Sequence, residues 1–171
     1  MMPVNHADNR AAELRADFDA AFAAPPAAVA TATDNFLVIV SGGERRLLRL
    51  RDIAGLFVDR RIVTVPGADT ALIGITGLRG AIVPVYRLGA LLGEPLAETM
   101  PRWLAVAAGV ALAFAFDGLD NYLAIARDAI VPCGDGDVGR GHVRDSAITA
   151  LGTLPIVDLP SVARAIAANH S

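Results

Sequence analysis

Few residues in this 171-residue chain have the types and spacing that catalysis requires. His6, His142 and His170 lie far apart, and the single cysteine, Cys133, belongs to no cluster with metal-ligand spacing. All 15 basic residues are arginine, which excludes a Schiff-base lysine and a Walker-type phosphate-binding lysine. The sequence therefore predicts no enzyme, no metal site and no cofactor.

A glycine-rich motif, Gly134-Asp-Gly-Asp-Val-Gly139, has the literal spacing of a dinucleotide-binding loop. Such a loop needs its third glycine to open a helix, and Gly141 follows too soon. Asp135 and Asp137 would also place negative charge against a phosphate. We expect a loop over Gly134–Gly141, and a small ligand- or nucleotide-binding protein that uses it is one alternative function.

The side chain best placed for recognition is that of Arg79, which follows Leu78 between Gly77 and Gly80. Glycines favour a tight turn, so the turn would present a guanidinium that can pair with a carboxylate of a partner protein. The alternative is that Arg79 holds its own loop through Asp69 or a backbone carbonyl. We expect Arg79 to be the centre of a partner-binding site.

The residues around this turn complete the expected site. Ile75 and Leu78 would be apolar contacts beside the arginine or part of the core. Ala81–Tyr86 is a predicted strand, in which Pro84 favours an edge position or a bulge, and Gly93 ends a short helical turn. Arg87 is expected on the solvated surface or in altered partner contacts. The expected partner-binding residues are Ile75, Gly77, Leu78, Arg79, Gly80 and Arg87.

Arginines also cluster before this segment, at positions 45, 46, 49 and 51 and then at 60 and 61. Acidic residues at 44, 52 and 59 are interleaved with them, which favours a solvated strand face. The alternative is a docking surface for an acidic protein. The net charge of −3 and the pI near 5.5 argue against nucleic-acid binding.

The chain is 54% hydrophobic, yet its apolar runs are short. The longest, Leu104–Phe116, is well below the roughly 20 residues of a membrane span. No secretory signal is visible at the start of the sequence, and a single cysteine suits a reducing compartment. We expect a cytoplasmic protein without direct membrane insertion.

The order of elements predicts a mainly β domain. Residues 1–33 form an Ala-rich arm, helical or disordered, and the folded domain is expected over 34–171 with subdomains near 34–98 and 99–171 and strands that cross over. A final helix is expected to be capped by Ser161. The expected strands are Phe36–Val40, Arg46–Leu50, Ile53–Val58, Arg61–Val65, Ala81–Tyr86, Trp103–Ala107, Val110–Asp117, Tyr122–Ala126, Ala129–Val131 and Leu154–Val157.

A faint internal repeat indicates two related halves. The segments Ile82–Leu88 and Thr153–Leu159 both run from apolar residues through a proline into a leucine-led helical turn. Many short strands with turn signals between them are typical of small barrels. The repeat therefore predicts a duplicated barrel unit.

The segment Gly74–Gly93, GITGLRGAIVPVYRLGALLG, resembles the signature of the CheW family, the adaptor domains of bacterial chemosensory arrays. The resemblance extends over roughly Phe36–Ala168. It implies two fused five-stranded SH3-like barrels with short helices and a C-terminal helix. It also implies a non-catalytic adaptor that joins the cytoplasmic tip of methyl-accepting chemoreceptors to the regulatory domain of a CheA-type histidine kinase, in arrays at the inner face of the membrane.

Within the resemblance, Arg79 would lie near a hydrophobic groove between the barrels that takes the receptor hairpin. Two positions depart from the family pattern. Family members usually carry a polar residue where this chain has Gly77, and an aspartate where it has Arg87. These departures favour a second alternative, a CheW-like scaffold of another sensory or motility system.

Overall fold

The computed structural model of the chain describes residues 32–67, 70–95, 98–133 and 141–169. The expectations for residues 1–31, for Asp69 and for the glycine motif between 134 and 140 lie outside these ranges. The described residues belong to one compact unit, Ala32–Ser171.

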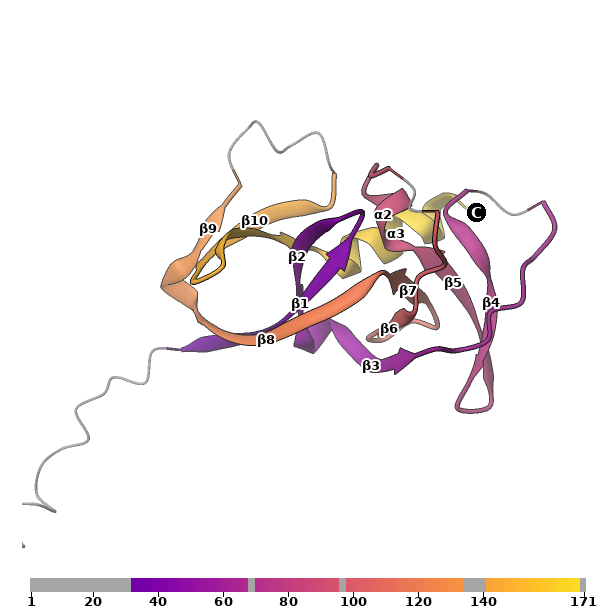
Figure 1. Ribbon diagram of the computed structural model, residues 1–171. Coiled ribbons are helices and arrows are strands. Elements are labelled where there is room, and N and C mark those ends of the chain that lie inside the picture. Colours follow the sequence, from indigo (N-terminus) through magenta and orange to yellow (C-terminus); the bar gives the residue numbers. More distant parts are fainter. Residues whose placement is uncertain (1–31, 68–69, 96–97, 134–140, 170–171) are drawn as a thin grey trace, which may run out of the picture. The chain divides into compact units, whose positions relative to one another are not determined.

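Eleven strands form two mixed sheets in the described residues (Figure 1). The strands of the first sheet are β1 (Thr33–Ser41), β2 (Glu44–Arg49), β8 (Gly118–Ala126), β9 (Ile130–Pro132), β10 (Val143–Thr149) and β11 (Gly152–Val157). Those of the second sheet are β3 (Ile53–Val58), β4 (Leu72–Leu78), β5 (Ala81–Arg87), β6 (Trp103–Ala107) and β7 (Ala113–Phe116). The orders are β8-β1-β2-β11-β10-β9 and β3-β6-β7-β5-β4.

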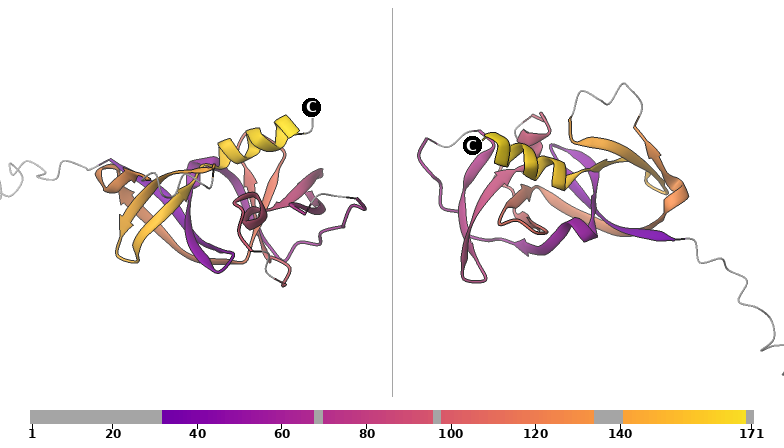
Figure 2. Two further views of the ribbon diagram at one scale, coloured as in Figure 1. Left: turned by 90° about the horizontal axis from the view of Figure 1, so that it is seen from above. Right: turned by 180° about the vertical axis from the view of Figure 1, so that it is seen from behind.

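The helices are few, as expected. The 3-10 turns η1 (Leu50–Asp52) and η2 (Arg127–Ala129) precede β3 and β9, and the short helix α2 (Leu88–Leu91) follows β5. The C-terminal helix α3 (Leu159–Asn169) crosses the molecule beside both sheets (Figure 2).

Three apolar clusters explain why the two sheets form one domain. Phe36 and Val38 of β1 point into a cluster enclosed by the first sheet, whereas Leu37 and Ile39 point into a cluster shared with the second sheet and α3. A third cluster, around Val85, lies inside the second sheet. Because alternate residues of a strand face opposite sides, β1 is buried on both faces. The expected pair of barrels with a shared core is confirmed.

The sequence halves do not map directly onto the barrels. β1 and β2 pair with the strands after residue 117, while β3 to β7 form the second sheet. The reason is the parallel pairing of β11 with β2, at Ile156–Leu47 and Val157–Leu48. This pairing carries the N-terminal hairpin into the sheet of the second half.

The internal repeat has a structural counterpart. β5 and β11 each pair in parallel with another strand, and each parallel ladder begins one residue after a proline, Pro84 or Pro155. Each strand then leads into a helix whose first residue, Leu88 or Leu159, is fully buried. The two proline segments therefore occupy equivalent places in the two barrels.

Pro84 lies in an internal strand, so the expected edge position is wrong; the register shift in this hairpin lies on β4, between Leu72 and Gly74. It lies opposite Ile75 of β4, whose N–H and C=O are both engaged by Val63 on the other side. The nitrogen of Pro84 therefore faces β7, and the pairing of β5 with β7 begins only at the next residue, Val85. The missing N–H of proline consequently removes no ladder hydrogen bond.

Several element predictions need correction. Residues 61–65 form no strand, only a bridge between Val63 and Ile75. Gly74 explains this close approach, because a Cβ there would lie 2.3 Å from the Val63 carbonyl oxygen. Strands β4 and β10 were not predicted. The side chain of Asp158, rather than Ser161, caps α3, since its Oδ1 accepts the Ser161 N–H at 3.0 Å.

Candidate partner-binding surface

The β4–β5 hairpin closes with a two-residue turn at Arg79 and Gly80. Their φ angles are 50° and 82°, and Leu78 pairs with Ala81 on either side of them. Two central residues with positive φ are typical of a type I′ turn, which prefers Asn-Gly. Arginine in this region is strained by about 1–2 kcal/mol. The turn presents Arg79 as expected, but Gly77 lies in β4 outside it.

The guanidinium of Arg79 lies over the β3 strand. Its Cζ is 5.7 Å from the ring centre of Phe57, and the Cζ of Arg60 is 5.3 Å from the same ring. A Cβ on Gly55 would lie 3.7 Å from an Arg79 Nη. No carboxylate among the described residues pairs with Arg79.

The nearest acidic residue on the chain after β3 is already paired. Both oxygens of Asp59 accept hydrogen bonds of 2.7 Å from Arg102. These hydrogen bonds lower the pKa of Asp59, and the positive charge of Arg102 lowers this pKa further. The charge of Asp59 is therefore neutralised by Arg102, and no carboxylate among the described residues forms an ion pair with Arg60 or Arg79.

A groove runs beside the turn, with a volume of about 420 Å³. Apolar side chains stand open in it: Ile82 is 73% exposed and Val63 is 53% exposed. The Thr76 hydroxyl donates a hydrogen bond of 2.8 Å to the Arg61 carbonyl and ties the two walls together. The residues that line the groove are Arg60, Arg61, Val63, Ile75, Thr76, Gly77 and Ile82.

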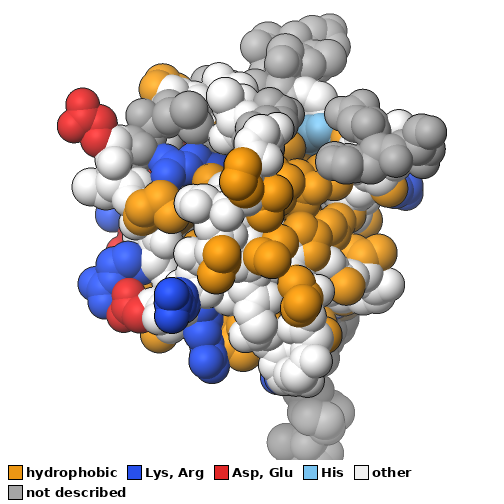
Figure 3. Space-filling view, turned by 90° about the vertical axis from the view of Figure 1, so that its right-hand side faces the viewer, with side chains coloured by type: hydrophobic (Ala, Val, Ile, Leu, Met, Phe, Trp, Pro, Cys, Tyr) orange, Lys and Arg blue, Asp and Glu red, His pale blue; other side chains and the backbone are white. Residues whose placement is uncertain are grey.

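Seen from the side on which Figure 1 draws β4 and β5, apolar side chains gather in one area with arginines beside it (Figure 3). We call the turn at Arg79, the ring of Phe57 and this groove the hairpin surface. Its residues come from the second barrel and the segment after β3. This groove therefore does not lie between the barrels, as the resemblance implied, because none of its lining residues belongs to the first sheet.

The other expected site residues divide between surface and core. Ile75 is half-buried in the groove wall, and Gly77 is exposed there. Leu78 is only 5% exposed and packs inside the second barrel, so it supports the turn from beneath. Arg87 is half-buried, and its guanidinium makes an exposed contact of 3.4 Å with the Thr99 carbonyl in a loop of its own chain.

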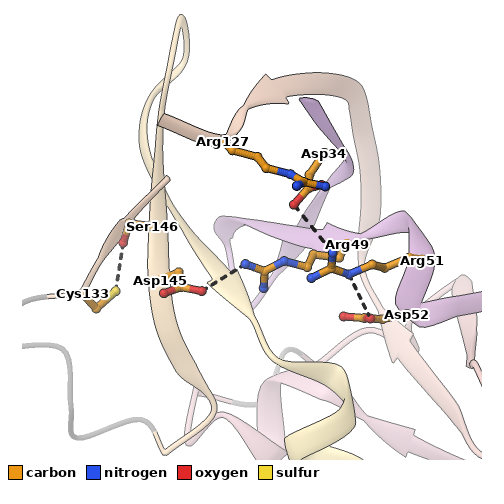
Figure 4. A network of polar contacts seen from close by, with 8 residues as sticks. All are labelled: Asp34, Arg49, Arg51, Asp52, Arg127, Cys133, Asp145 and Ser146. Atoms are coloured by element: carbon orange, nitrogen blue, oxygen red, sulfur yellow. Dashed lines mark hydrogen bonds and ion pairs between the residues drawn. The ribbon is translucent and has the colours of Figure 1, made fainter. Parts of the chain in front are cut away.

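The arginines of β2 and η1 are ion-paired. Arg45 contacts Asp120 at 2.5 Å, at the surface. Arg49 lies between the Phe36 ring and Asp145, whose Oδ2 is 3.0 Å away (Figure 4). The prediction of a solvated strand face is therefore wrong for Arg49, whose side chain is only 15% exposed.

Asp34 and Asp52 hold the next arginines of this network (Figure 4). Asp34 lies 3.7 Å from Arg51 and 3.2 Å from Arg127. Asp52 lies 3.9 Å from Arg51. Burial raises the pKa of Asp52, against the opposing effect of Arg51 and Arg49. These pairs leave the arginines of the hairpin surface as candidates for binding an acidic partner.

Sequence reasoning missed the most buried ion pair. Arg46 is 1% exposed and its Nε donates to Oε1 of Glu94, which is 3% exposed. Glu94 Oε2 also accepts a hydrogen bond of 2.9 Å from Ser41. Strand β2 belongs to the first sheet, and Glu94 follows α2, which continues strand β5 of the second sheet, so this pair joins the two barrels.

The end of α2 positions Glu94. Gly93 has φ 71°. Its N–H donates to the Ala90 carbonyl at 3.1 Å, and the N–H of Glu94 donates to the Gly89 carbonyl at 2.8 Å. These two bonds make a Schellman motif. In the sequence, this helix end is visible as Leu-Leu-Gly-Glu. Gly93 predicted where the helix ends, but nothing in the sequence predicted that Glu94 would form an ion pair.

Two glycines make room for the carboxylate. A Cβ on Gly42 would lie 2.7 Å from Glu94 Oε2, and one on Gly89 would lie 2.9 Å from it. Gly42 also has φ 57°, and its N–H donates to Asp117 at 3.0 Å. Gly42 is therefore required both by its backbone conformation and by the packing of Glu94.

The remaining polar residues show no reactive arrangement in the described part of the chain. Cys133 is half-buried, and its Sγ lies 2.9 Å from the Ser146 hydroxyl. His142 Nδ1 lies 3.0 Å from the Ser161 hydroxyl. Among the described residues no three His, Cys, Asp or Glu side chains could hold a metal ion. No described helix is long and apolar enough to cross a membrane.

Comparison with known proteins agrees with this architecture. The family model described as CheW-like domain matches residues 35–167. The crystal structure of the scaffolding protein TtCheW from Thermoanaerobacter tengcongensis is similar with a TM-score of 0.65 and 20% identity, over 74% of this chain and 89% of that one. No curated protein matches the sequence. The chain belongs to the CheW-like family.

Proposed function

We propose that this chain is a non-catalytic adaptor that couples the cytoplasmic tips of methyl-accepting chemoreceptors to a CheA-type histidine kinase. Its place in a family of scaffolds supports this function. The observation that carries it furthest is the hairpin surface, where exposed apolar side chains lie beside arginines that have no described acidic partner. Arginines and large apolar residues are frequent interface anchors.

The kinase contact is proposed to use this surface. A CheW-like regulatory domain of the kinase would dock against the second barrel, with Arg79 and the groove at the centre of the contact. The receptor would bind a different face of the domain, because a bridge needs both partners at once. Coupling then requires that the adaptor contact the two signalling states of the complex with different free energies.

This function places the protein in the cytoplasm, at receptor arrays on the inner face of the membrane. The test is co-sedimentation of the kinase with receptor-containing membranes, with and without the chain. We expect the kinase to reach the pellet only when the chain is present. Equal amounts of kinase in both pellets would refute the adaptor role.

Two positions favour a second candidate, a scaffold of another sensory or motility system. Gly77 lies exposed in the wall of the groove, so its missing side chain alters the contact surface. Arg87 contacts the Thr99 carbonyl of its own chain. The titration that discriminates the candidates uses regulatory domains from every CheA-type kinase of the organism. Binding restricted to a kinase that does not control chemotaxis would favour the second candidate.

A further inference from the structure

The hairpin surface contains a second, smaller cavity, directly beneath Arg79. Its volume is about 190 Å³, and its lining is almost wholly apolar. Leu78 and Val83 form part of its floor from the core, while Ala54 on the outer strand β3 and Ala81 after the turn stand at its exposed rim. An apolar cavity of about 150 Å³ accommodates a benzene-sized group, so this one has room for a large aliphatic side chain.

Arg79 supplies a charge at the mouth of this cavity. Its guanidinium lies over the Phe57 ring, and no carboxylate among the described residues pairs with it. Gly55 lies beside both side chains: a Cβ there would lie 3.0 Å from the Phe57 ring and 3.7 Å from an Arg79 Nη, so a larger residue would crowd the ring. An arginine fixed by a ring and a strained turn is pre-organised, so it loses little freedom when it binds.

We infer that this site recognises a protein segment with a large aliphatic residue next to an aspartate or glutamate. The aliphatic side chain enters the cavity, and the carboxylate accepts hydrogen bonds from Arg79. The strain in the turn is consistent with this role, because a less strained residue at this position would not bring a guanidinium to the rim. The inference rests on the proposed function for the identity of the partner, but the chemistry of the segment can be tested without that partner.

The test uses three capped dipeptides, N-acetyl-Leu-Glu, N-acetyl-Leu-Gln and N-acetyl-Ala-Glu methylamides, titrated into the 15N-labelled full chain and followed by NMR. We expect saturable shifts at Gly55, Phe57 and Arg79 with Leu-Glu. The Gln and Ala probes should bind about threefold to tenfold more weakly, because each lacks one of the two contacts. Equal shifts with all three probes, or shifts confined to Val63 and Ile82 in the groove, would overturn the inference.

Two variants separate the contacts. Arg79→Gln should remove the preference for Leu-Glu over Leu-Gln, and Ala54→Leu should fill the cavity and remove the preference for Leu over Ala. Asp69→Asn is the control for an internal partner, and we expect it to bind as the unmodified chain does. A marked gain of affinity in Asp69→Asn would show that the chain itself occupies Arg79, and would overturn the inference.

The outcome is distinguishable from failure of the proposed function. Selective Leu-Glu binding without binding of any kinase regulatory domain would support the recognition chemistry and refute the kinase as partner. Kinase binding that Ala54→Leu and Arg79→Gln leave unchanged would refute the recognition chemistry and the kinase contact at Arg79, but not the adaptor role itself. Concentration-dependent shifts of the same amides without any probe would make a second copy of the chain the occupant, and would also overturn the inference.

Discussion

Replacing Glu94 by alanine tests the buried ion pair between the two barrels. The change leaves the Arg46 guanidinium, which is 1% exposed, without its most buried partner, and it removes the acceptor of the Ser41 hydroxyl. Glu44 remains bound to Arg46 at 2.8 Å, but its own side chain is 59% exposed. The variant therefore contains a buried positive charge that only a surface carboxylate compensates.

The expected loss in the free energy of unfolding is about 3–5 kcal/mol, the range for breaking a buried pair by removing one partner. A domain of this size is stable by roughly 5–15 kcal/mol, so the loss amounts to about a fifth of its stability or more. The neighbouring residue on β2 gives a matched control. Arg45 pairs with Asp120 at the surface, and Arg45→Ala should cost at most about 1 kcal/mol.

The assay is equilibrium unfolding in urea, followed by the fluorescence of Trp103, which is the only tryptophan and packs against the shared core. With a slope near 2 kcal/mol per molar urea, Glu94→Ala should lower the midpoint by roughly 2 M. The double variant Arg46→Met with Glu94→Met should recover part of the loss, since no charge remains buried. A Glu94→Ala midpoint equal to that of Arg45→Ala would refute the reasoning.

Three further outcomes are expected. Gly42→Ala should destabilise the domain more than Gly43→Ala. Both glycines have positive φ, but only a Cβ on Gly42 would lie 2.7 Å from Glu94. Equal urea midpoints for the two variants would contradict this. Burial raises the pKa of Asp52 above its ordinary 3.8. The stability of the unmodified domain relative to Asp52→Asn should therefore be greatest below pH 3.8 and fall as the pH rises through the raised pKa. A relative stability that rises with pH over this range would contradict the prediction. Removal of residues 1–31 should leave the melting temperature nearly unchanged, because the three apolar clusters lie within the remaining unit.

Local patterns predicted the parts of the fold that depend on nearby residues. The glycine stop after α2 and the turn at Arg79 follow from the φ preferences of glycine, and the strand around Pro84 follows from its apolar run. The repeat at the two prolines predicted the duplicated barrel, because both strands begin the same parallel pairing. These features needed no knowledge of long-range contacts.

The sequence could not predict contacts between distant residues. Arg46 looks like its neighbours in a run of arginines, and only the path of the chain after Gly93 places Glu94 beside it. Likewise, whether Arg79 faces a groove between the barrels depends on where the hairpin lies relative to the shared core. Leu78 and Ile75 also differ in burial, because Leu78 packs inside the second barrel whereas Ile75 lies in the wall of the groove.

The most direct test of the central claim is calorimetric titration of the full chain with the regulatory domain of a CheA-type kinase from the same organism. Arg79→Glu is the perturbation, and Arg164→Glu on the exposed face of α3 is the control with the same change in net charge. The account predicts binding that Arg79→Glu abolishes and Arg164→Glu preserves. Equal affinity of the two variants would contradict the assignment of the hairpin surface to the kinase.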